Sequence, residues 1–167
     1  QSSNAEKAPS PEELVLETVQ RTNNYIAENH GETGMFATMF IGLLNPATGE
    51  MFYVNCGHEP PPLVRNGKIK QLLRPSGLPV GAMEDSPYTC NKITFQKDDY
   101  LFLYTDGITD GLDSEGNSFS KERLLDCVAA NHTSLHSLVK RVEDAFFSHV
   151  SGGEVTDDVT FLALKRG

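Results

Sequence analysis

The sequence has no long apolar run and few basic side chains. No stretch approaches the roughly 18 apolar residues that span a bilayer, and no basic segment followed by an apolar one indicates a signal peptide. Acidic residues outnumber basic ones by 23 to 14, giving a formal net charge of −9. This charge opposes binding to nucleic-acid phosphates, so we expect no nucleic-acid partner and no direct membrane contact. It also repels phosphorylated substrates, so chemistry on phosphate would require bound cations.

Cysteine is scarce as well. Cys56, Cys90 and Cys127 are far apart, and none of them forms a C-x-x-C pair. The spacing therefore indicates neither a zinc site nor a disulfide framework. We expect reduced, packed thiols, which favours a cytoplasmic location.

Several catalytic motifs are missing too. The chain contains no G-x-S-x-G, G-x-x-x-x-G-K-[ST] or G-x-G-x-x-G sequence, which argues against a serine nucleophile on a strand-to-helix elbow and against a nucleotide-binding loop. His58 could act as a general acid because its unperturbed pKa is near neutrality. No second histidine lies at ligand spacing and two prolines follow closely, so we favour a hydrogen-bonded loop histidine.

The remaining pattern predicts an α+β fold. Residues 1–5 are small and polar and resemble the remnant of an expression tag, so we take residues 6–167 as a single domain. Helices are expected near both ends of this domain and antiparallel hairpins between them. The expected helices begin at Ser10-Pro11, Ser120 and Leu135, and the expected strands cover residues 35–44, 50–56, 62–65, 68–70, 88–95, 100–105 and 155–164.

Two acidic clusters lie at strand ends. The apolar segment 100–105 leads into Asp106 and Gly107, and Asp110 follows four residues after Asp106. Asp157 and Asp158 lie near the start of the last apolar run. Carboxylate oxygens are the ligands that Mg²⁺ and Mn²⁺ prefer. Asp106-Gly107 alone is better explained by turn chemistry, and Asp157-Asp158 alone decides nothing. Two such clusters are nonetheless what a metal site built across neighbouring strands would contain.

The order of the motifs resembles that of the stage II sporulation protein E-like phosphatases, a bacterial branch of the metal-dependent serine/threonine protein phosphatases. The resemblance runs from about Ser10 to Lys165. It is carried by the segments at residues 35–40 (MFATMF), 45–49 (NPATG), 53–61 (YVNCGHEPP), 77–81 (GLPVG), 105–107 (TDG) and 157–160 (DDVT).

This resemblance implies a four-layer α/β/β/α sandwich of antiparallel sheets with a binuclear Mn²⁺ or Mg²⁺ centre. It implies that Asp106 and Asp157 ligate metal, that Asp158 assists, and that Asp110 lies near an additional metal. A metal-bridging water would attack a phosphoserine or phosphothreonine, and the expected substrate is a phosphorylated anti-anti-sigma-type protein in stress and sporulation signalling.

The chain departs from the family in one respect. Family members begin with strands bearing Gly-Asp motifs that contribute further ligands, and neither motif occurs here. We therefore expect a domain without its first strands and helix, weak metal binding and impaired catalysis. Exposed sheet edges would favour a homodimer or strand exchange. Two alternatives stay open, namely a non-catalytic module that binds a partner protein, and an α+β domain whose acidic loops are only solvated turns.

Overall fold

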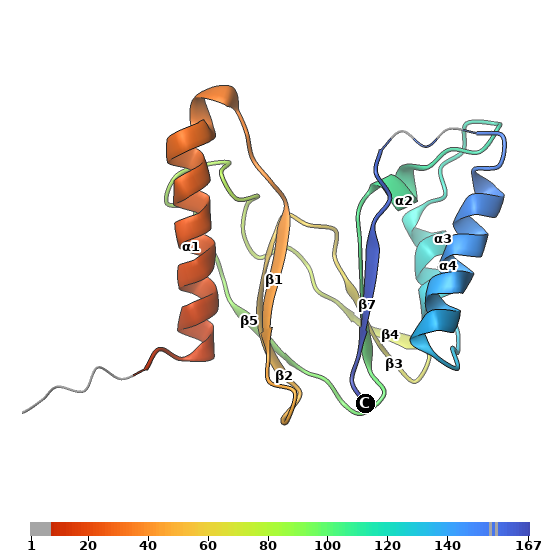
Figure 1. The fold of residues 1–167 in the computed structure, drawn as a ribbon, viewed down its shortest axis with the longest axis horizontal. Helices are drawn as coiled ribbons and strands as arrows, with labels where there is room; N and C mark the ends of the chain where they lie inside the picture. Colours follow the sequence, from red (N-terminus) through yellow and green to blue (C-terminus); the bar gives the residue numbers. More distant parts are fainter. Residues whose placement is uncertain (1–7, 154, 156) are drawn as a thin grey trace, which may run out of the picture. The chain divides into compact units, whose positions relative to one another are not determined.

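The structure, a computed structural model, describes residues 8–153, 155 and 157–167, so the segment 1–5 lies outside the described residues. The chain divides into two compact units. The first contains the residues up to His58 together with Pro75–Thr94, and the second contains Glu59–Arg74 and Phe95–Gly167. Each unit holds one antiparallel sheet with helices against it (Figure 1).

The first unit is a three-stranded sheet covered by one long helix. Val15 and Val19 on the helix are buried against Val54 and Cys56 of the central strand, and burying each valine contributes about 2 kcal/mol. The strand order is β1-β2-β5, with both pairings antiparallel. The elements are α1 (Pro11–His30), the short 3-10 helix η1 (Gly31–Thr33), β1 (Met39–Leu44), β2 (Glu50–Cys56) and β5 (Asn91–Thr94).

Helix α1 begins where the sequence predicts. The Ser10 hydroxyl accepts a bond from the Glu13 amide at 3.2 Å, and the Glu13 carboxylate accepts one from the Ser10 amide at 2.6 Å. This capping box satisfies two amide groups that have no partner within the helix, and Pro11 at the first helical position needs none.

The loop at residues 75–87 is ordered because α1 holds it. Asn23 is fully buried, and its side-chain oxygen accepts bonds from the Gly81 amide and the Tyr88 hydroxyl, both at 2.9 Å. Its side-chain amide donates to the Met83 carbonyl at 2.9 Å. The Pro- and Gly-rich stretch 75–87 is therefore a structured loop of the first unit.

The second unit is a four-stranded sheet, ordered β4-β3-β6-β7, with two helices against one face. Phe102 and Tyr104 of β6 belong to the same buried cluster as Leu124, Leu138 and Phe146 from the helices. The elements are β3 (Pro62–Arg65), β4 (Lys68–Leu72), β6 (Tyr100–Tyr104), α2 (Gly107–Asp110), α3 (Lys121–Ala129), α4 (Leu135–His149) and β7 (Phe161–Lys165).

The α+β class with two antiparallel sheets and their helices is confirmed. Three strands begin later than predicted: β1 at Met39 rather than residue 35, β5 at Asn91 rather than residue 88, and β7 at Phe161 rather than residue 155. For β1 and β7 the ladder stops where the partner strand ends, at Cys56 and Tyr104. Before β5, Ser76 takes the place of a direct partner: its amide bonds to the Asn55 carbonyl of β2, and its carbonyl accepts a bond from the Thr89 amide. The short helix α2 was not predicted, because Asp-Gly is equally compatible with a turn.

Among the described residues, no helix combines the length and the apolar character needed to cross a membrane.

Candidate metal centre

A buried strand carries the first aspartate to the surface. Leu101, Phe102 and Tyr104 of β6 are almost fully buried, whereas Asp106 is exposed. The ladder between β6 and β7 ends at Tyr104 and Phe161, and one more bond follows it, from the Thr105 amide to the Thr160 carbonyl at 2.9 Å. Because the strand is fixed by the core, Asp106 leaves the sheet at a rigid position.

Asp110 follows Asp106 by one turn of α2. The Asp106 carbonyl accepts bonds from the amides of Thr109 and Asp110 at 2.8 and 2.9 Å. The Asp110 side chain is exposed, and it accepts a bond from the Thr109 hydroxyl at 3.2 Å. Both carboxylates therefore belong to one compact turn at the end of β6.

The second acidic cluster lies against this turn. A Cβ atom added to Gly107 would lie 2.6 Å from the Asp158 carbonyl oxygen and 3.1 Å from that of Asp157. No side chain larger than hydrogen fits there without movement of the backbone. The structure thus brings together two segments about fifty residues apart in sequence, at the position where the resemblance expects a metal.

Thr105 is a further residue of this region, and sequence reasoning missed it. Its hydroxyl lies 2.9 Å from the Asp158 carbonyl, to which it donates, and accepts a bond from the Thr160 amide at 3.0 Å. The Asp157 carboxylate accepts a bond from the Asp158 amide at 2.7 Å. A threonine immediately before the aspartate was the available sequence signal, but β-branched residues are common in strands for other reasons.

The four carboxylates carry uncompensated charge. Asp106, Asp110, Asp157 and Asp158 are all exposed, and within the described part of the chain no lysine or arginine forms an ion pair with any of them. Clustered carboxylates without basic partners attract cations.

The donor type fits a hard divalent cation, because carboxylate oxygens are its preferred ligands. The number of donors is small, however, since the described residues contain no group of three or more His, Cys, Asp or Glu side chains arranged to hold a metal. Asp106 and Asp157 can therefore supply part of a coordination shell rather than a closed site.

His58 is held in a shaped loop. Its amide donates to the Asn55 side chain at 2.8 Å, and the Asn55 side chain donates back to the His58 carbonyl at 3.0 Å. These bonds fix the backbone of the loop, which supports the structural interpretation of this histidine.

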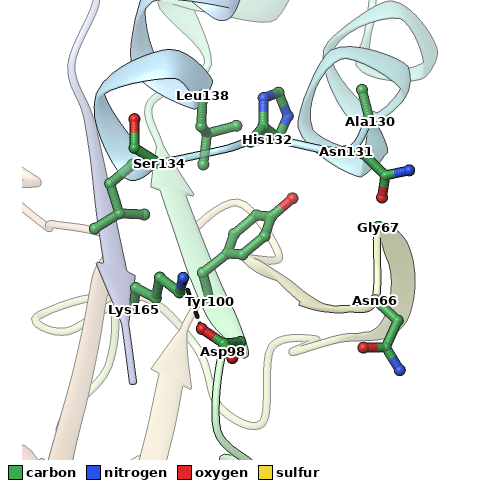
Figure 2. A pocket seen from close by; sticks show the side chains of 11 residues that line it. Asn66, Gly67, Asp98, Tyr100, Ala130, Asn131, His132, Ser134, Leu138 and Lys165 are labelled. Carbon is green, nitrogen blue, oxygen red and sulfur yellow. Dashed lines mark ion pairs between the residues drawn. The ribbon is translucent and has the colours of Figure 1, made fainter. Parts of the chain in front are cut away.

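The second unit also contains a cavity of about 270 Å³, at the other end of β6. Tyr100, His132 and Lys165 line it, and Figure 2 shows them around the opening. Tyr100 donates to the Val128 carbonyl at 2.6 Å, and burial raises the pKa of its hydroxyl to about 12. Lys165 pairs with Asp98 at 2.8 Å, as the dashed line marks. None of the four clustered aspartates lines this cavity.

Comparison with known proteins gives one family and several relatives. The family model described as "Stage II sporulation protein E (SpoIIE)" matches residues 3–167. Protein IcfG of Synechocystis is 33% identical over 151 residues, which cover 90% of this chain and 24% of that protein. Phosphoserine phosphatase RsbU of Bacillus subtilis is 26% identical, over 89% of this chain and 44% of that protein. The chain therefore spans less than half the length of these relatives.

Solved structures share the fold. The crystal structure of the RsbU and RsbW domains of Rv1364c from Mycobacterium tuberculosis has a TM-score of 0.68 and 26% identity, covering 95% of this chain and 43% of that chain. The catalytic domain of the serine/threonine protein phosphatase PstP, solved in complex with 2 manganese ions, has a TM-score of 0.65 and 17% identity, covering 96% of this chain and 73% of that chain.

Proposed function

The chain belongs to the stage II sporulation protein E family, and from this membership we propose that residues 6–167 are a phosphatase domain whose parent protein removes phosphate from phosphoserine or phosphothreonine on a regulatory protein. The observation that carries the proposal is the contact between the Asp106-Gly107 turn and the Asp157-Asp158 segment. Relatives named phosphoserine phosphatases support the reaction class.

We propose Mn²⁺ or Mg²⁺ as the cofactor, a pair of ions in the complete centre. Asp106 and Asp157 would hold metal, with Asp158 and Asp110 as neighbouring carboxylates. The manganese in the related PstP structure supports this choice. Such ions, when bound, supply a water of lowered pKa and positive charge beside the phosphate.

The residues of this chain would position the reaction. β6 fixes Asp106, and Gly107 leaves room for the backbone of the second segment. The negative charge of the four aspartates repels a phosphate group. Bound cations would neutralise this charge, so a phosphorylated side chain would bind only when metal is present. This dependence reconciles a net charge of −9 with a phosphorylated substrate.

The proposed substrate is an anti-anti-sigma-type phosphoprotein, which would place the reaction in the cytoplasm. The likeness to a structure that joins RsbU and RsbW domains supports a partner of this regulatory class. A homodimer stays a prediction. Leu162 and Leu164, 59% and 37% exposed on β7, are apolar surface that a second copy could cover, and sedimentation analysis would test this.

Turnover by this chain alone should be low, because the described residues offer no three-donor group. The test is hydrolysis of a phosphoserine peptide by the chain at millimolar Mn²⁺, compared with the full-length protein. Low but metal-dependent release of phosphate, abolished in Asp106→Asn, supports the proposal. Metal-independent release, or full activity in Asp106→Asn, contradicts it.

The same shortage of donors favours a second candidate, a non-catalytic module that binds its partner without turnover. Full-length protein that binds the phosphorylated partner but releases no phosphate at any Mn²⁺ concentration would support the module over the enzyme.

A further inference from the structure

Thr105 joins the two acidic segments. It directly precedes Asp106, and its hydroxyl is bonded to the backbone on either side of Val159. We propose that Thr105 is a positioning residue, whose hydroxyl fixes the distance between the Asp106 turn and the Asp157-Asp158 segment. The proposal rests on the proposed function, because a fixed distance matters only if both segments bind the same cation cluster.

The hydroxyl is fully used. It is 2.9 Å from the Asp158 carbonyl and 3.4 Å from that of Thr160, and its single proton therefore goes to Asp158. Its oxygen accepts the Thr160 amide proton. The Thr105 side chain therefore continues the link between the two segments beyond the last backbone bond of the β6–β7 ladder.

Among the residues that the structure describes, few other interactions hold the segment 157–159 at β6. The backbone ladder ends at Phe161, and the bond from the Thr105 amide reaches only Thr160. The Asp158 amide bonds within its own segment, to Asp157. Val159 packs against the core, which anchors the middle of the segment but does not set the orientation of the Asp158 carbonyl. That orientation is set by the Thr105 hydroxyl.

Gly107 limits the approach from the other side. Its α-carbon lies so close to the Asp158 carbonyl that an added Cβ would be at 2.6 Å. Contact at Gly107 prevents the segments from coming closer, and the bond from Thr105 prevents them from separating. The spacing is therefore set in the protein before any cation binds.

Two substitutions at Thr105 distinguish the effect of its hydroxyl from the effect of its side-chain shape. Thr105→Val keeps the β-branched shape and removes both bonds, whereas Thr105→Ser keeps the hydroxyl and removes a methyl group. Thr22→Val is the matched control, because Thr22 also donates to a backbone carbonyl, that of Thr18 at 2.8 Å, but lies on α1.

The first measurement needs no metal. Amide exchange by NMR at Thr160, and cross-relaxation between the Gly107 α-protons and the Asp158-Val159 backbone, report the spacing directly. We expect Thr105→Val to speed exchange at Thr160 about tenfold and to weaken the cross-peaks, and Thr105→Ser to restore both. Unchanged exchange and cross-peaks in Thr105→Val would overturn the proposal, whatever the metal result.

The second measurement uses Mn²⁺ alone, through its broadening of amide signals, which detects even millimolar binding. In the wild type, the amide signals of residues 106–107 and 157–158 should broaden at the same Mn²⁺ concentration. In Thr105→Val, broadening of the signals of residues 157–158 should require about tenfold more Mn²⁺. Thr105→Ser and Thr22→Val should match the wild type.

Equal affinity for Mn²⁺ in Thr105→Val and the wild type, despite altered spacing of the two segments, would overturn the positioning role. If Mn²⁺ broadens none of these signals in the wild type, the proposed function and the positioning role both fail, while the structural bond is still judged by the first measurement.

Discussion

The two ends of β6 differ in what their carboxylates bind. Before the strand, Asp98 pairs with Lys165 at 2.8 Å and Asp99 with Arg65 at 2.6 Å. After the strand, the four aspartates of the candidate metal centre have no basic partner among the described residues. Removing one partner of a buried carboxylate pair is costly, whereas carboxylates without a basic partner are available to a cation.

The start of β6, where the carboxylates are paired, also holds the more buried carboxylate, that of Asp99. The Asp99 side chain is 1% exposed, and its oxygens accept three bonds from Arg65 and one from the Gln96 amide at 2.7 Å. The hydrogen bonds to Asp99 raise the pKa of the Arg65 guanidinium, which stays charged. The difference between the ends therefore separates residues that hold the sheet from residues available to a ligand.

The largest expected effect is at the paired end. Asp99→Ala removes the acceptor of the bonds from Arg65 and from the Gln96 amide, and should lower the free energy of unfolding by about 3 kcal/mol. Urea denaturation measures it. Asp98→Ala is the matched control, since Asp98 is mostly exposed and its loss should change the midpoint little. Similar losses in both variants would contradict the comparison.

The next effect is at the unpaired end. Gly107→Ala forces a methyl group against the Asp158 carbonyl, which should cost about 1 to 3 kcal/mol and weaken Mn²⁺ binding. Gly31→Ala is its control, because Gly31 has a helical φ of −59° and nothing within 4 Å of the added Cβ. Thermal unfolding of the two variants should differ clearly, and equal melting temperatures would show that the two segments are not in contact.

A smaller effect, this time a gain in the free energy of unfolding, tests whether Asp106 lacks a basic partner. Asp106→Asn relieves repulsion within the cluster, so in metal-free buffer it should raise the free energy of unfolding by about 0.3 kcal/mol. Excess Mn²⁺ should stabilise the wild type more than the variant. Destabilisation of the metal-free variant would mean that Asp106 has a structural partner after all.

The smallest effect concerns pH. The hydrogen bond and charge of Lys165 lower the pKa of the Asp98 carboxyl. A lowered pKa in the folded state contributes stability above the ordinary value of about 4, and this contribution is lost as pH falls through the folded value. Wild type and Asp98→Asn should therefore differ slightly at pH 7 and converge as the pH falls below the folded value. A difference that grows toward low pH would refute the assignment.

Most elements could be predicted from the sequence because their signals are local. The capping box at Ser10 and the Asn66-Gly67 turn fix a helix start and a hairpin by themselves. The starts of β1 and β7 could not be predicted, because they depend on where the partner strand stops. The start of β5 could not be predicted either, because Ser76, from a distant segment, bonds to Thr89 and to Asn55 of β2 in place of a direct ladder.

The candidate site was predicted in its residue types but not in its geometry. Asp106 and Asp157 were chosen from their motifs, and only the structure shows that Gly107 touches the Asp157-Asp158 backbone. Thr105 could not be identified, because its two hydrogen-bond partners lie more than fifty residues away in sequence. Long-range contacts of this kind leave no local pattern.

Calorimetric titration of the chain with Mn²⁺ tests the central claim most directly. Wild-type protein, an Asp106→Asn and Asp157→Asn double variant, and Asp98→Asn as the paired-end control should be compared. We predict weak, saturable binding to the wild type and to Asp98→Asn, and none to the double variant. Equal binding to all three proteins, or none to the wild type, would contradict a metal centre at the end of β6.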